Sequence, residues 1–99
     1  MVIKRDGRRE RFDRDKLRRG LFKSCEKTQI SAAQIEALVQ NIEQEIKQRG
    51  EEEIESIQIG KWVAKKLKIL DKIAYIRFAS VFKRFVDIDD IKKEVKKLL

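Results

Sequence analysis

The sequence contains no histidine, and its single cysteine, Cys25, has no second cysteine to pair with in this chain. These absences exclude a zinc site, a histidine-based catalytic triad and an intrachain disulfide, and with them most classes of enzyme. We therefore expect Cys25 to be a small core residue, and we expect no metal site built from the side chains of this chain.

Long apolar runs are also missing. No stretch approaches the roughly 20 apolar residues that a membrane span needs, and the N-terminus lacks the apolar segment of a secretory signal. The sequence thus predicts a cytoplasmic protein without membrane contact.

Proline is absent, and only four glycines are present to interrupt regular structure. Helix ends must therefore be marked mainly by polar capping residues. A suitable residue stands before each segment with helical spacing of apolar residues, and this agreement between local and overall pattern is typical of a foldable chain.

Charge, in contrast, is abundant: 42% of the residues are charged and 41% are apolar. At this length the composition predicts one globular domain, residues 1–99. The net charge is +6 over residues 1–23, −5 over residues 24–60 and +7 over residues 61–99. Basic ends predict an anionic partner, but charge alone does not choose among nucleic acid, phosphate-bearing small molecules and anionic lipid.

The first twelve residues combine this charge with a turn signal. The pair Asp6-Gly7 separates two short segments, residues 2–5 and 8–12. Asp-Gly favours the type I′ hairpin turn, in which both central residues have positive φ. We predict a β cap over residues 1–12, with a disordered tail as the alternative because the strands carry little apolar surface.

Residues 13–99 are predicted to be helical. The first helix is expected to end near Lys27, the second at Gly50, and the acidic residues 51–53 form a solvated connection to a short strand at Ile54. Ser31 with Gln34 forms a capping box. The expected capping residues are Asp13, Ser31, Ser56, Asp71 and Asp87.

Apolar residues recur at helical spacing in each of these segments. They are Leu17, Leu21, Phe22 and Cys25; Ile35, Leu38, Val39, Ile42 and Ile46; Ile59, Val63, Leu67 and Leu70; Ile73, Ala74, Phe78, Val81, Phe82 and Phe85; and Ile88, Ile91, Val95 and Leu98. The predicted fold class is α+β and mostly α: a small N-terminal β-hairpin or sheet cap on a bundle of four main helices, plus a C-terminal helix whose lysine-rich face is solvated.

The hairpin and the start of the first helix form a candidate anion site. Lys4 and Arg5 point to opposite faces of a strand, so a ligand held by both lies near the strand end or against the next element. Lys16 stands in the first helical turn, where free backbone N–H groups and the helix dipole also attract an anion. Glu10 either accepts a hydrogen bond from a ribose hydroxyl or pairs with a neighbouring arginine across the hairpin.

Three strings carry a family resemblance: VIKRDGRRERFDRDKLRRGLFKSCEK, SIQIG and IAYIRFASVFKRF. Together they resemble the ATP-cone, a regulatory nucleotide-binding domain at the N-terminus of many ribonucleotide reductase large subunits. The last string is more similar to the cone of the bacterial transcriptional repressors of ribonucleotide reductase genes. The resemblance covers nearly the whole chain and implies a β cap over helices, with ATP or dATP bound between them.

The resemblance also implies roles for individual residues. Lys4, Arg5 and Lys16 match the phosphate contacts, and Tyr75 and Arg77 match positions near a second nucleotide or a subunit contact. The positions that match the sugar, the base pocket and the elements that close the site are Val2, Glu10, Leu17, Ser56, Ile59 and Gly60.

The implied ligand is ATP or dATP, with Mg²⁺ as a candidate companion ion and no zinc in this chain. The implied partners are adenine nucleotides and further copies of the same chain, self-associating according to the nucleotide bound. The zinc ribbon of the repressors is absent from this sequence, so DNA contact is expected only through such a ribbon.

Three functions remain open at this stage. The first is the regulatory adenine-nucleotide module of a ribonucleotide reductase gene repressor, and the second is the same module of a reductase large subunit. The third is a small basic helical domain that binds nucleic acid through phosphates. None of them is an enzyme by itself, because no Walker lysine loop and no base positioned on water is recognisable.

Overall fold

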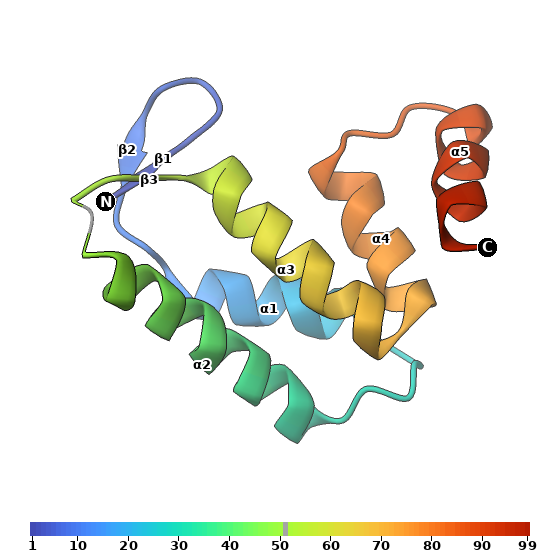
Figure 1. Ribbon diagram of the computed structural model, residues 1–99, viewed down its shortest axis with the longest axis horizontal. Helices are drawn as coiled ribbons and strands as arrows, with labels where there is room; N and C mark the ends of the chain where they lie inside the picture. The colour runs from blue at the N-terminus through green and yellow to red at the C-terminus, as the bar shows by residue number, and fades with distance from the viewer. Residues whose placement is uncertain (51) are drawn as a thin grey trace.

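A computed structural model describes residues 1–50 and 52–99, so the predicted connection at 51–53 lies partly outside the described residues. The elements in chain order are β1 (Val2–Ile3), β2 (Arg9–Glu10), α1 (Arg14–Ser24), α2 (Ala32–Arg49), β3 (Ile54–Glu55), α3 (Ser56–Leu70), α4 (Lys72–Phe82) and α5 (Ile88–Leu98). The predicted class, mostly α with a small β cap, is confirmed (Figure 1).

The cap is a three-stranded sheet with strand order β2-β1-β3. Val2 pairs with Glu10 in the antiparallel neighbour and with Ile54 in the parallel neighbour. The predicted strand at Ile54 is thus confirmed, and it joins the hairpin to the start of α3. Both Val2 and Ile54 are 7% exposed, so the first twelve residues are an integral part of the fold in this structure.

The hairpin turn differs from the predicted type. Lys4 donates its N–H to the carbonyl oxygen of Arg8 at 2.7 Å, and Gly7 donates its N–H to the carbonyl oxygen of Lys4 at 2.9 Å. Gly7 has φ of 88°, whereas Asp6 is not among the residues with positive φ. The loop therefore has three residues and a left-handed glycine in its last position, and the type I′ prediction is wrong. Arg5 consequently lies in the loop, beyond the last paired residue of β1.

Side-chain caps begin four of the five helices in the described chain. Asp13 and Asp71 accept hydrogen bonds from backbone N–H groups, Ser31 and Asp87 form capping boxes, and Gly50 ends α2 in the left-handed conformation with φ of 63°. The predictions for these five residues are confirmed.

Three helix boundaries differ from prediction. α1 ends at Ser24 rather than near Lys27. α4 ends at Phe82, because Arg84 adopts a left-handed φ of 56°, which leaves Phe85 in the connection to α5. Ser56 does not cap α3, because β3 leads directly into the helix. Ser56 is already its first residue, and the cap position is occupied by Glu55, without a side-chain cap hydrogen bond.

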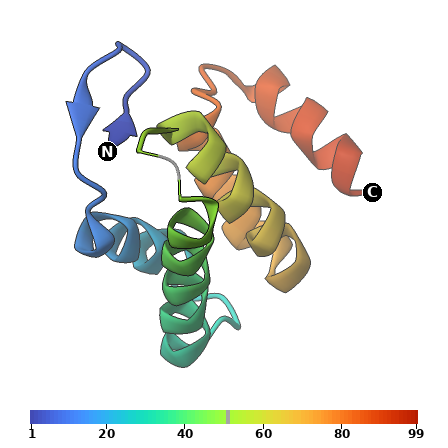
Figure 2. The ribbon, with the colours of Figure 1, turned by 60° about the vertical axis from the view of Figure 1, so that its left-hand side comes forward.

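The core lies among α1 to α4 and includes Val2 and Ile54 of the sheet, and α5 packs against α4 at the periphery, away from the sheet (Figures 1 and 2). This peripheral position leaves part of the predicted apolar stripes uncovered. The exposed members are Leu70, Ile73, Val81, Ile88 and Val95. No helix of residues 1–50 and 52–99 is long and apolar enough to span a membrane.

Candidate functional site

Seven of the predicted site residues line one cavity of about 220 Å³, which we call the inner hollow. Its walls come from the hairpin, the connection at residues 11–13, α1 as far as Leu21 and the first turn of α3, with Phe78 of α4 at one side. The seven are Val2, Lys4, Glu10, Lys16, Leu17, Ser56 and Ile59.

The inner hollow has an apolar floor and a basic rim. Val2 and Ile59 are nearly buried, at 7% and 8% exposure, and Leu17 is partly buried beside them. Sheet pairing fixes Val2, and the direct passage from β3 into α3 fixes Ile59. The cations Lys4 and Lys16 come from different elements: Lys4 follows the last residue of β1, and Lys16 lies in the first turn of α1. Such a cavity suits a flat apolar group that carries a negative charge.

Glu10 lies on the same face of the hairpin as Lys4. Its Oε2 atom is 3.9 Å from Nζ of Lys4. The predicted alternative, pairing with a neighbouring arginine, is therefore wrong, because the cation that Glu10 contacts in the structure is a lysine. Arg8 and Arg9 pair with other carboxylates, those of Asp6 and Glu53.

Arg5 lies outside the inner hollow, in an adjoining cavity of about 380 Å³ that we call the outer hollow. Its guanidinium donates a hydrogen bond to the backbone carbonyl of Phe82 and stands over the ring of Phe82, 5.2 Å from the ring centroid. The two hollows share Lys4 and Ser56. The structure thus brings Lys4 and Lys16 together and places Arg5 in the next compartment. Arg84 and Arg8 also line the outer hollow.

Gly60 does not line either hollow, but it determines how closely α4 approaches α3. A Cβ atom built on Gly60 would lie 2.1 Å from the ring of Phe82. The absence of a side chain at Gly60 therefore lets the ring of Phe82 pack on the first turns of α3. The guanidinium of Arg5 stands over this same ring.

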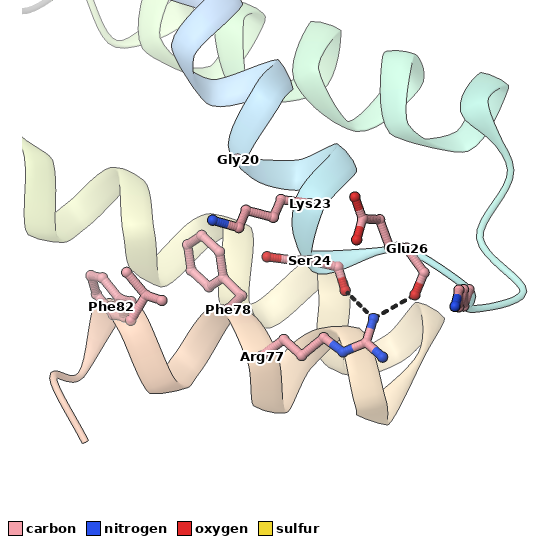
Figure 3. A pocket seen from close by; sticks show the side chains of 9 residues that line it. Gly20, Lys23, Ser24, Glu26, Arg77, Phe78 and Phe82 are labelled. Atoms are coloured by element: carbon pink, nitrogen blue, oxygen red, sulfur yellow. Dashed lines mark hydrogen bonds between the residues drawn. The ribbon is translucent and has the colours of Figure 1, made fainter. Parts of the chain in front are cut away.

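A third cavity, of about 610 Å³, lies between the C-terminal half of α1 and α4. Figure 3 shows Arg77 reaching from α4 to the end of α1, where it donates hydrogen bonds to the carbonyl oxygens of Glu26 at 2.5 Å and Ser24 at 3.4 Å. Phe78 and Phe82 stack in the same cavity with ring centroids 5.7 Å apart. Arg77 could be identified from the sequence but this cavity could not, because the spacing of apolar residues within one helix does not determine which face of another helix it packs against.

Tyr75 lies apart from Arg77 and from all three cavities. It is 6% exposed, and its hydroxyl donates a hydrogen bond to the carboxylate of Glu94 on α5. Burial, followed by this hydrogen bond, raises the pKa of Tyr75 above 10.0. The two residues assigned to a second nucleotide or subunit contact therefore belong to different surroundings.

No group of three or more potential metal-ligating side chains occurs in the part of the chain that the structure describes. Magnesium in a nucleotide site is held largely by phosphate oxygens and water. A companion Mg²⁺ would therefore need the nucleotide to complete its coordination.

The family model for the ATP cone domain matches residues 1–97. The chain belongs to the ATP-cone family. Among its curated relatives, the transcriptional repressor NrdR of Petrotoga mobilis is 47% identical over 97 residues, which cover 98% of this chain and 65% of the relative. The transcriptional repressor NrdR of Listeria innocua is 48% identical over 99 residues, covering the whole of this chain and 64% of the relative. This cone thus spans just under two thirds of the length of these relatives.

Family membership confirms the resemblance and implies an adenine-nucleotide-binding domain. The relatives are named as transcriptional repressors, and the prediction of a regulatory domain agrees with these names.

Proposed function

We propose that this cone is the nucleotide sensor of a repressor of ribonucleotide reductase genes. It binds ATP or dATP without turning them over, and the bound nucleotide controls the self-association of the protein. The observation that carries the proposal is the inner hollow, where seven site residues from three separate chain segments converge.

The chemistry of the hollow supports an orientation for the nucleotide. The adenine base lies on Val2, Leu17 and Ile59, because these are its apolar walls. Lys4 and Lys16 bind phosphate as charge-assisted donors. A cavity of about 220 Å³ is smaller than the usual ligand pocket of roughly 300–1,000 Å³, so the phosphate chain continues into the outer hollow, toward Arg5.

The start of α3 adds donors to this arrangement. Its N-terminal N–H groups receive no side-chain cap, and Ser56 at this position lines both hollows. Uncapped N–H groups and the positive end of a helix dipole favour a phosphate. The missing cap therefore supports nucleotide binding at the place where Ser56 and Gly60 were expected to close the site.

Glu10 is the residue through which the sugar is read. Its carboxylate lies at the hairpin side of the inner hollow, 3.9 Å from Lys4, and an acceptor there distinguishes ribose from deoxyribose by one hydroxyl group. Mg²⁺ accompanies the phosphates. In the full-length repressor, which is cytoplasmic, nucleotide-dependent self-association alters DNA binding by a zinc ribbon that these 99 residues do not include.

Calorimetric titration with ATP, dATP and GTP tests the proposal. We expect saturable binding of both adenine nucleotides, about 10- to 100-fold weaker in a Lys4→Ala, Lys16→Ala double variant. A Lys92→Ala, Lys96→Ala variant removes the same charge from the distant α5 and should bind nearly as the wild type does. No heat of binding with either adenine nucleotide would contradict the proposal.

Light scattering without nucleotide, with ATP and with dATP tests the regulatory part. We expect the mass of the particle to differ between at least two of the three conditions. Identical masses at saturating nucleotide would restrict the proposal to binding alone. Steep salt-dependent binding to duplex DNA by this chain, without nucleotide binding, would instead favour the nucleic-acid-binding alternative.

A further inference from the structure

The outer hollow is more basic than the inner one. Lys4, Arg5, Arg8 and Arg84 line it, and Asp6 is its one acidic wall residue within the described chain. Asp6 is already engaged, since it accepts hydrogen bonds from the backbone N–H of Arg8 at 3.0 Å and from its Nε at 2.6 Å. The charge of Arg8 is therefore largely compensated, and Lys4 pairs with Glu10 at 3.9 Å, whereas Arg5 and Arg84 have no carboxylate partner among residues 1–50 and 52–99.

Arg84 reaches the hollow from the segment that follows α4. No carboxylate of residues 1–50 and 52–99 pairs with its side chain. Its φ of 56° is a left-handed conformation that residues other than glycine and asparagine rarely adopt. Its N–H donates to the carbonyl of Val81 at 3.2 Å. The backbone thus turns sharply at Arg84 and fixes the direction in which its side chain leaves the chain.

The contact between Arg5 and Phe82 holds this turn against the hairpin. Arg5 donates to the carbonyl of Phe82, two residues before Arg84, and stands over the ring of Phe82. A guanidinium has five N–H donors, so the bond to this carbonyl leaves others for an anion. Arg5 can therefore fasten the end of α4 and bind a phosphate at the same time.

We infer that Arg84 is a further ligand of the phosphates beyond the α-phosphate, which the outer hollow receives. The inference rests on the proposed nucleotide site and extends it to the end of α4. Lys4 and Ser56 line both hollows and form the boundary between them. A nucleotide with its base in the inner hollow therefore extends across this boundary, and its β- and γ-phosphates contact Arg5 and Arg84.

The test compares Arg84→Asn with Lys27→Asn by calorimetric titration of ATP, ADP and AMP. Lys27 is a matched control because it is also a cation in the left-handed conformation, with φ of 58°, but it lines the cavity between α1 and α4. Asparagine tolerates this conformation in both variants, and each variant removes one positive charge. A third variant, Arg84→Lys, restores the charge on a different head group.

Arg84→Asn should weaken ATP and ADP binding about five- to twentyfold, as expected for the loss of one charge-assisted contact. AMP binding should change less than twofold, Lys27→Asn should change all three nucleotides less than twofold, and Arg84→Lys should recover part of the ATP affinity.

Two results would overturn the assignment of Arg84: an ATP affinity of Arg84→Asn equal to that of Lys27→Asn, or an equal loss for AMP and ATP, which indicates a long-range charge effect. Failure of the wild type to bind any of the three would overturn the proposed nucleotide site itself, and the assignment with it.

Discussion

The hydroxyl of Tyr75 on α4 donates a hydrogen bond to the carboxylate of Glu94 on α5. Glu94 is only 4% exposed although it lies in a lysine-rich helix. Nζ of Lys83 is 3.0 Å from its Oε1 atom, and Nζ of Lys97 is 3.8 Å from its Oε2 atom. This buried carboxylate, with two hydrogen-bond donors, Tyr75 and Lys83, and an ion-pair partner, Lys97, fastens the peripheral helix α5 to the rest of the domain.

Replacing Tyr75 by phenylalanine removes one of these donors and keeps the ring. We expect the free energy of unfolding to fall by about 1–2 kcal/mol, because a buried carboxylate is left less satisfied. Urea unfolding measures this. Lys97→Ala removes the most exposed of the three partners and should cost much less. Equal losses for the two variants would contradict the special role of the Tyr75 hydroxyl.

The same site predicts a pH dependence. Burial would raise the pKa of Glu94, but the hydrogen bonds from Tyr75 and Lys83 and the positive charges of Lys83 and Lys97 outweigh burial and lower it below 4.5. A carboxyl whose pKa is lower in the folded chain stabilises the fold above its unfolded pKa and loses that contribution as the pH falls through its folded pKa. The wild type should therefore lose stability below about pH 4.5.

Glu94→Gln isolates this contribution. Urea midpoints of the variant and the wild type should differ most near neutral pH and converge as the pH falls through the lowered folded-state pKa of Glu94, below which the wild-type carboxyl is also uncharged. A difference that stays constant over the whole acid range in which the wild type remains folded would show that Glu94 acts through packing alone.

Two glycines in helices predict opposite effects of the same substitution. A Cβ on Gly60 meets the ring of Phe82 at 2.1 Å, whereas a Cβ on Gly20 meets nothing within 4 Å. Gly60→Ala should destabilise the domain by about 1–3 kcal/mol through overpacking. Gly20→Ala should stabilise it by about 0.5–1 kcal/mol, because alanine has the higher helix propensity. Thermal unfolding of the two variants checks the sign of each effect.

Two serines stand at helix starts, but only one of them caps its helix. The hydroxyl of Ser31 accepts a hydrogen bond from the N–H of Gln34 at 3.1 Å, and the side-chain Oε1 of Gln34 accepts one from the N–H of Ser31. Ser31→Ala should cost about 1 kcal/mol. Ser56 makes no such cap, so Ser56→Ala should be nearly neutral in urea unfolding without nucleotide. A large loss for Ser56→Ala would show that it has a structural role that the contacts do not reveal.

Much of the local structure could be predicted because its causes are local. A capping side chain acts on N–H groups two or three residues away, so Asp13, Ser31, Asp71 and Asp87 could be recognised from the chain itself. The turn at Gly7 was located correctly but given the wrong type, because Asp-Gly fits both a two-residue and a three-residue loop. The choice between them depends on how the hairpin pairs with its neighbours.

The candidate site was predictable only in part. Family resemblance selected the residues, and the structure assembled seven of them in one hollow. It also placed Arg5 in a second hollow and Tyr75 against Glu94, contacts between residues 77 and 19 positions apart in the chain. No periodicity specifies such contacts, because they depend on the angles at which whole helices pack.

The sequence by itself determined where elements begin, which faces are apolar and that the ends of the chain are basic, since these follow from nearest neighbours and charge. Only the tertiary structure decided that Glu94 is buried and that Val81 is exposed. It also decided that Lys4 lines one cavity with Lys16 and an adjoining cavity with Arg84. The physical reason is that burial and shared cavities are properties of packed surfaces, and a surface exists only after distant segments have come together.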